Sequence, residues 1–72
     1  MDLMQLSINQ LSRYYRNIEI MSFKIDEDIV KIHFSYKNSY NSIDFKLCEF
    51  HIVKTKGLFG KDKTRLALLN IT

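Results

Sequence analysis

Hydrophobic residues at the start of the chain recur at the spacing of an α-helix. Met4, Ile8, Leu11, Tyr15 and Ile18 are separated by four, three, four and three positions, which places them on one helical face. The polar side of this helix would carry Gln5, Asn9, Ser12, Arg13 and Arg16, whereas Leu3, Leu6 and Tyr14 widen the apolar stripe. A wide stripe favours packing on a sheet over a narrow coiled-coil seam.

Capping residues indicate where this helix begins and ends. Asp2 is suited to cap the start, and Gln5 three residues later completes a capping-box pattern. Asn17 is the expected end, because asparagine tolerates the left-handed conformation that follows a last turn. The sequence therefore predicts an amphipathic helix of roughly 14 residues, about 21 Å long.

Beyond residue 20 the pattern changes to the two-residue period of β-strands. Apolar residues alternate with polar ones over residues 21–25 and, more clearly, over residues 30–36. An acidic turn, residues 26–28, separates these segments, and a polar turn at residues 37–42 follows them. The two segments are expected to form a hairpin with one buried face.

A third strand begins with Ile43, Phe45 and Leu47 in phase, but Phe50 and Ile52 follow the opposite phase. A shift of one residue within a strand is typical of a β-bulge or of a strand that bends across a sheet. We therefore expect one of these irregularities near residue 49.

The last strand is expected at residues 64–71, with apolar residues on both faces. Leu66 and Leu68 would lie on one face, and Ala67, Leu69 and Ile71 on the other. Such a strand is either central in its sheet or has a second face that meets another molecule, because edge strands are normally protected by polar residues. A short C-terminal helix is the alternative for this segment.

Together these elements predict a single small α+β domain over residues 1–72. One N-terminal amphipathic helix would pack on a four-stranded antiparallel sheet in meander order. A domain of this size buries only about 60% of its unfolded surface, so its stability is marginal. Cys48 is the only cysteine, which excludes an intrachain disulfide and indicates a reducing compartment, the cytoplasm. A homodimer through residues 66–71 or the adjacent helix face is the expected compensation.

Positive charge is concentrated in the second half of the chain. Residues 1–36 hold four basic and five acidic side chains, whereas residues 37–72 hold seven basic and three acidic ones. Five of these basic residues surround a predicted hairpin turn in which Leu58 and Phe59 lie between Gly57 and Gly60. They are Lys54, Lys56, Lys61, Lys63 and Arg65, and the acid among them is Asp62.

The residues able to support metal binding or catalysis are few. His33, Cys48 and His51 have no paired-ligand spacing, so neither a metal nor a cofactor is expected. In a strand His51 would face away from Cys48, which leaves the thiol without an activating base. The acidic turn is expected to be solvated, and no catalytic residues are assigned. The protein is therefore not expected to be an enzyme.

Two binding functions remain. The first is a protein–protein interaction module, an accessory or inhibitor protein of a phage or mobile element, that covers a site on a larger protein with an acidic surface. The contact residues would be Leu58, Phe59, Lys54, Lys56, Lys61, Lys63 and Arg65. The alternative is a nucleic-acid-binding module in which the lysines contact phosphates and Phe59 stacks on an unpaired base. A membrane partner is not expected. A different alternative for Leu58 and Phe59 is that they fold back over the open end of the sheet and complete the core.

Overall fold

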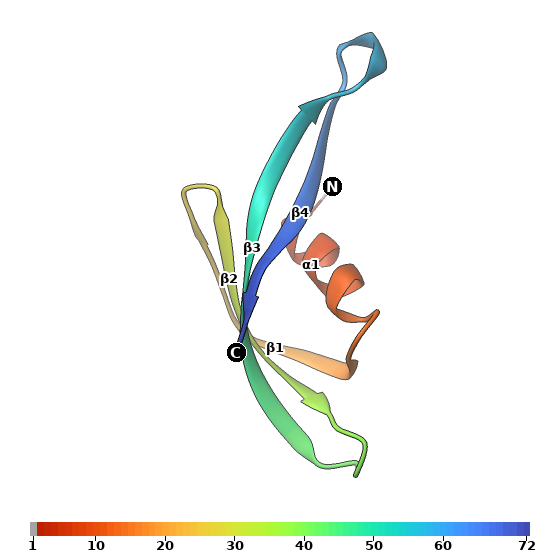
Figure 1. The fold of residues 1–72 in the computed structure, drawn as a ribbon, viewed down its shortest axis with the longest axis vertical. Coiled ribbons are helices and arrows are strands. Elements are labelled where there is room, and N and C mark those ends of the chain that lie inside the picture. The colour runs from red at the N-terminus through yellow and green to blue at the C-terminus, as the bar shows by residue number, and fades with distance from the viewer. Residues whose placement is uncertain (1) are drawn as a thin grey trace.

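One helix lies across an antiparallel sheet of four strands that follow one another in meander order β1–β2–β3–β4 (Figure 1). The computed structural model describes residues 2–72. The elements are α1 (Leu3–Leu11), β1 (Arg16–Asp26), β2 (Ile29–Lys37), β3 (Ile43–Lys56) and β4 (Asp62–Ile71), with a 3₁₀ turn at Leu58–Gly60. The molecule is elongated, 47 × 21 × 17 Å, because the β3–β4 hairpin extends well beyond the other strands. The α+β class and the meander order predicted from the sequence are confirmed.

Helix α1 begins as predicted but ends earlier. The Asp2 carboxylate accepts a hydrogen bond from the Met4 amide at 3.1 Å, whereas the Gln5 side chain bonds Asn9, so no capping box forms. The helix ends at Leu11, not at Asn17, which has a φ of 54° within β1. The chain can leave the helix early because apolar residues beyond Leu11 reach the same core from β1.

The inner face of α1 is also rotated relative to the predicted stripe. Ser7 and Leu11 are buried, and Leu3 and Leu6 pack against the core beside them. The small Ser7 side chain donates a hydrogen bond to the Leu3 carbonyl at 2.8 Å, so its hydroxyl is satisfied inside the helix. A small residue at this position allows the helix to approach the sheet closely.

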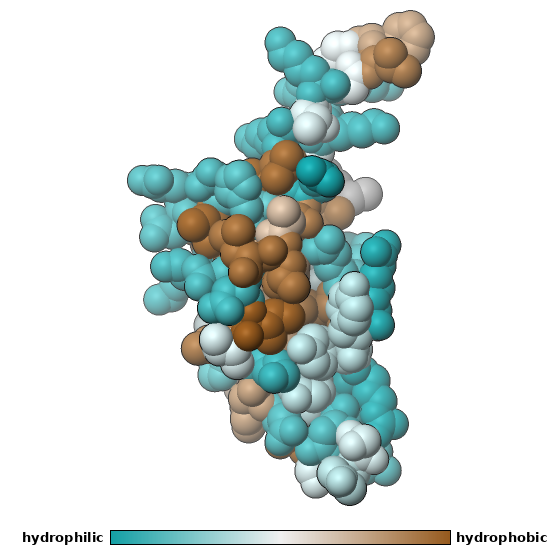
Figure 2. Space-filling model, viewed as in Figure 1, coloured by the Kyte–Doolittle hydropathy of each residue, from teal (hydrophilic) through white to brown (hydrophobic). Residues whose placement is uncertain are grey.

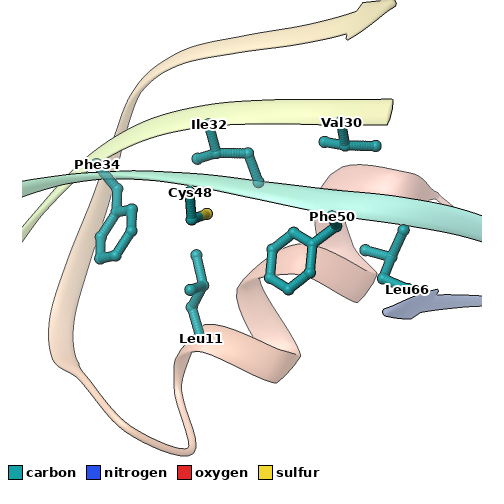
Figure 3. Packing of buried hydrophobic residues seen from close by; sticks show 7 residues of the cluster. All are labelled: Leu11, Val30, Ile32, Phe34, Cys48, Phe50 and Leu66. Carbon is teal, nitrogen blue, oxygen red and sulfur yellow. The ribbon is translucent and has the colours of Figure 1, made fainter. Parts of the chain in front are cut away.

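Strand β2 carries the centre of the core. Val30, Ile32 and Phe34 are almost completely buried on the face toward α1. Their neighbours on β3 are Cys48 and Phe50, and Figure 3 shows these side chains converging with Leu11 and Leu66 on the same side of the sheet.

Strand β3 does not contain the predicted irregularity in its pairing with β2. Its register with β2 is continuous from the Ile29–His51 pair to the Lys37–Ile43 pair. Cross-strand partners share a face of the sheet. The shift in the spacing of apolar residues along β3 therefore means that the apolar side chains move from one face of the sheet to the other. Residues 43–47 direct their apolar side chains away from α1, whereas Cys48 and Phe50 lie toward α1. The bulge expected in β3 is therefore wrong, whereas the alternative of a strand that bends across the sheet agrees with the curved course of β3 in Figure 1.

The bulge lies instead in β4, at Leu69. Phe50 pairs with Leu68, but Glu49 pairs with Asn70, so Leu69 is an extra residue. This places Leu66, Leu68 and Ile71 opposite residues 52, 50 and 48 of β3, on the α1 side. The strand is at the edge of the sheet, so both the central position and the helical alternative considered for this segment are wrong.

Candidate functional site: a basic arm

The outer part of the β3–β4 hairpin projects beyond the sheet as a two-stranded arm, residues 53–65. The pairing of β2 with β3 reaches the Ile29–His51 pair, and the Ile52 amide then donates to the Asp28 carbonyl at 2.7 Å. Past this point residues 53–56 of β3 pair with residues 62–65 of β4 without a third strand beside them. Four residues of strand correspond to about 13 Å, to which the turn adds further reach. The arm is the extended upper part of Figure 1.

Leu58 and Phe59 lie at the end of the arm and are exposed. The exposed fractions of these residues are 87% and 98%. Figure 2 shows apolar side chains at the very end of this hairpin, with hydrophilic side chains along the arm below them. The alternative in which the two side chains fold back to complete the core is therefore wrong. The turn lies too far from the sheet for them to reach it.

The backbone of the turn requires its two glycines. The Gly57 amide donates a hydrogen bond to the Lys61 carbonyl, and a Cβ atom added at Gly57 would lie 2.6 Å from that oxygen. Gly60 has a φ of 76°, in the left-handed region. Phe59 shares this region, with φ 68° and ψ 23°, which is rare for a bulky residue and costs about 1–2 kcal/mol. The chain therefore holds Phe59 outward in an unfavourable backbone conformation.

The basic residues of the arm are distributed over both of its faces. Lys54 pairs with Thr64, and Lys56 pairs with Asp62, on the face continuous with the α1 side of the sheet. Lys63 pairs with Thr55 on the opposite face, which it shares with Arg65.

Lys61 follows the turn, so the predicted contact residues surround the arm and do not form a one-sided patch. The ion pairs found in residues 2–72, Lys31–Asp26 and His51–Asp28, include none of the five. Five basic residues and one acidic residue give the arm a net charge of +4, against +3 for the whole chain.

An Asp28–His51 pair joins the β1–β2 turn to the base of the arm. Asp28 Oδ2 and His51 Nε2 are 2.7 Å apart, and this hydrogen bond holds the pKa of Asp28 below its ordinary value. The sequence predicts a solvated acidic turn at Asp28 and gives no sign of this pair. The two residues are 23 positions apart, so no local spacing could reveal it.

Cys48 is enclosed in the core and faces away from His51. Burial raises the pKa of its thiol to about 11, so the reactive thiolate is scarce at neutral pH. No group of three or more His, Cys, Asp or Glu side chains in residues 2–72 is placed to hold a metal ion. Within the same residues, no helix has the length and apolar character needed to cross a membrane.

The arm is thus the part of the described chain where exposed apolar side chains, positive charge and strained backbone occur together. Comparison of the chain with protein-family models, curated proteins and solved structures finds no match in any of the three.

Proposed function

We propose that this protein is a non-enzymatic binding module that covers a site on a larger protein and contacts it through the arm. The observation that supports this most strongly is the exposure of Phe59, 98%, at the end of a projecting hairpin. A Phe side chain there contributes almost nothing to the core, yet the backbone that presents it is unfavourable. Aromatic side chains of this kind are frequent anchors of protein–protein interfaces.

The charge distribution favours an acidic cleft on the partner. Because lysines lie on both faces of the arm, acidic groups on two opposing walls would complement it better than a flat acidic surface. Leu58 and Phe59 would enter an apolar pocket at the end of the cleft, and the surrounding lysines would steer the approach. The protein would act as an accessory or inhibitory subunit in the cytoplasm, as a homodimer.

The absence of an enzymatic role is part of this proposal. Cys48, the side chain with the strongest intrinsic nucleophilicity, is buried and has a raised pKa. His51 is engaged with Asp28 on the other face of the sheet. These placements favour a protein that acts by occupying a surface.

A nucleic acid is the second candidate partner, favoured by the two-stranded form of the arm. A β-ribbon can enter the major groove of B-DNA, which is about 12 Å wide, and the long basic side chains of the arm would then be near the phosphates that border the groove. The arm is less suited to reading a sequence, because Arg65 is the one residue on it with the bidentate geometry used for guanine.

The contact role of the arm is tested by affinity capture from the native host, with and without nuclease. Phe59→Ala should weaken partner binding by about 2 kcal/mol or more, roughly 30-fold in Kd, without lowering the melting temperature. Tyr40→Ala is the matched control, because Tyr40 is 88% exposed at the turn between β2 and β3. Equal capture by the two variants would refute the proposed contact.

Salt dependence separates the two partner classes. Replacement of Lys61 and Lys63 by Gln should mainly slow association with a protein, and the effect should shrink as salt rises. Binding that is lost on nuclease treatment and falls linearly on a log–log salt plot would instead identify a nucleic-acid partner.

A further inference from the structure

The face of the sheet opposite α1, here called the open face, carries an unexpected row of large apolar side chains. Ile43, Phe45 and Leu47 project from β3 onto this face and are 60%, 57% and 56% exposed. Antiparallel sheets with one solvated face normally place polar residues there. In this part of β3 the pattern is reversed, because the polar residues Asp44 and Lys46 lie on the α1 side.

The row is continuous with neighbouring side chains of β2. Leu47 lies opposite His33, and Phe45 lies opposite Ser35, which is buried although it faces away from α1. The His33 and Phe45 rings have centroids 6.0 Å apart. The apolar row therefore belongs to β3 and lies beside polar side chains of β2, and no described element of this chain covers it.

We propose that a second copy of this chain covers the open face, with the two sheets packed face to face about a two-fold axis. This specifies the dimer of the proposed function but does not rest on the contact made by the arm. The described core contains seven buried hydrophobic residues, so a second apolar layer would add substantially to the stability of a small domain.

The available area suits a weak but specific dimer. A large side chain contributes roughly 150–250 Å² when fully buried, so three side chains more than half exposed offer about 300 Å² per copy. Two copies supply about 600 Å² of apolar area, which at the roughly 65% apolar share of homodimer interfaces implies about 900 Å² in total. This is slightly below the roughly 1,000 Å² of a stable biological interface, as expected for a weak or transient dimer.

Charge on the open face also favours a second copy over other partners. On the paired segments of β1, β2 and β3 it carries Arg16, Lys24, Lys31 and Lys37 together with Glu19, Asp26 and Glu49, a balance of +1. Mixed signs allow two identical faces to meet without strong repulsion. Two arms, each with a charge of +4, would repel each other, so the arm remains free for a different partner.

The β4 edge is a poorer site for the same contact. The bulge at Leu69 brings Ile71 to the α1 side, where Leu66 and Leu68 already lie, and it interrupts the regular edge that strand-to-strand pairing would need. The dimer surface is therefore placed on the open face and not on residues 66–71.

Sedimentation equilibrium over a wide concentration range tests this proposal. The wild-type chain should approach twice the chain mass, and Phe45→Gln should raise the dimer dissociation constant about 100-fold or more, because each loss occurs twice across a two-fold axis. Leu47→Gln should act in the same direction. Leu69→Gln is the matched control on the β4 edge, where Leu69 is 55% exposed, and it should leave the dimer intact.

Several outcomes would overturn the proposal. These are a wild-type chain that stays monomeric, a dimer unaffected by Phe45→Gln, or a dimer dissociated by Leu69→Gln alone. If the wild-type chain is monomeric and Phe45→Gln no longer binds the larger partner, the open face is the binding site for that partner and not for a second copy. Phe59→Ala should remain dimeric even where it no longer captures a partner, so failure of the arm contact and failure of the dimer are separable.

Discussion

The left-handed backbone of Phe59 makes Phe59→Gly a stabilising substitution. At φ 68° a residue with a side chain costs about 1–2 kcal/mol, whereas glycine adopts this conformation freely. Glycine also gains more freedom in the unfolded chain, which offsets about 0.5–1 kcal/mol. Because the Phe59 ring is 98% exposed, its removal loses almost no buried area. The free energy of unfolding should therefore rise by about 0.5–1 kcal/mol.

Leu58→Gly provides the matched control. Leu58 is also exposed, and it is not among the residues with positive φ. Glycine at this position brings only the entropic cost, so it should lower the free energy of unfolding by about 0.5–1 kcal/mol. Two glycine substitutions in adjacent exposed residues are thus expected to have opposite signs.

Urea and thermal unfolding of the two variants provide the measurement. In a domain of this size, 1 kcal/mol shifts the melting temperature by roughly 4–8 °C, so the variants should lie on opposite sides of the wild type. All samples should be compared at one protein concentration, because dimerisation raises apparent stability. A fall of more than about 10 °C for Phe59→Gly would mean that the ring packs in a core. Equal shifts for both variants would refute the left-handed conformation.

Two further predictions concern the turn and the core thiol. Gly57→Ala should lower the free energy of unfolding by about 1–3 kcal/mol in urea titrations, because the new Cβ atom would meet the Lys61 carbonyl oxygen. Gly60→Ala should lower it by only about 1 kcal/mol, because the space around Gly60 is open and only the left-handed backbone is unfavourable. Cys48 should resist thiol reagents in the folded chain at neutral pH. The pKa of the Cys48 thiol is about 11 in the folded chain against 9.0 in the unfolded chain, so the contribution of this thiol to the free energy of unfolding should fall as pH rises through this interval. Cys48→Ala should lower stability by roughly 1 kcal/mol and should lack this pH dependence. Two results would contradict these expectations: labelling of Cys48 by the thiol reagent at a rate faster than unfolding, or the same dependence of stability on pH in the wild type and in Cys48→Ala.

Much of the fold follows from periodicity in the sequence. The change from helical spacing to alternation near residue 20 predicts one helix before a set of strands, and residues 30–36 form the most buried strand as their pattern indicates. Asp2 caps the helix because a carboxylate at that position accepts amide hydrogen bonds whatever the rest of the chain does. The same local chemistry places the turn between Gly57 and Gly60 and the lysines around it.

The ends and faces of these elements depend on tertiary contacts. Tyr15 has the spacing of a helix, yet it packs against Phe34 and Tyr36 from the connection between α1 and β1, with ring centroids 5.3 and 4.6 Å away. Periodicity alone does not distinguish these two routes to one core. Similarly, the phase change in β3 fits either a bulge or a change of face, and only the continuous register with β2 decides between them.

The residues that gather at the tip of the last hairpin can be predicted from the sequence, because glycine placement and charge are local properties. Whether Leu58 and Phe59 are buried was decided by the tertiary structure. β2 begins at Ile29, so its pairing with β3 stops at His51 and the hairpin continues without support. An apolar side chain is buried only where another part of the chain is close enough to cover it, and that depends on strand lengths and register rather than on its own neighbours in sequence.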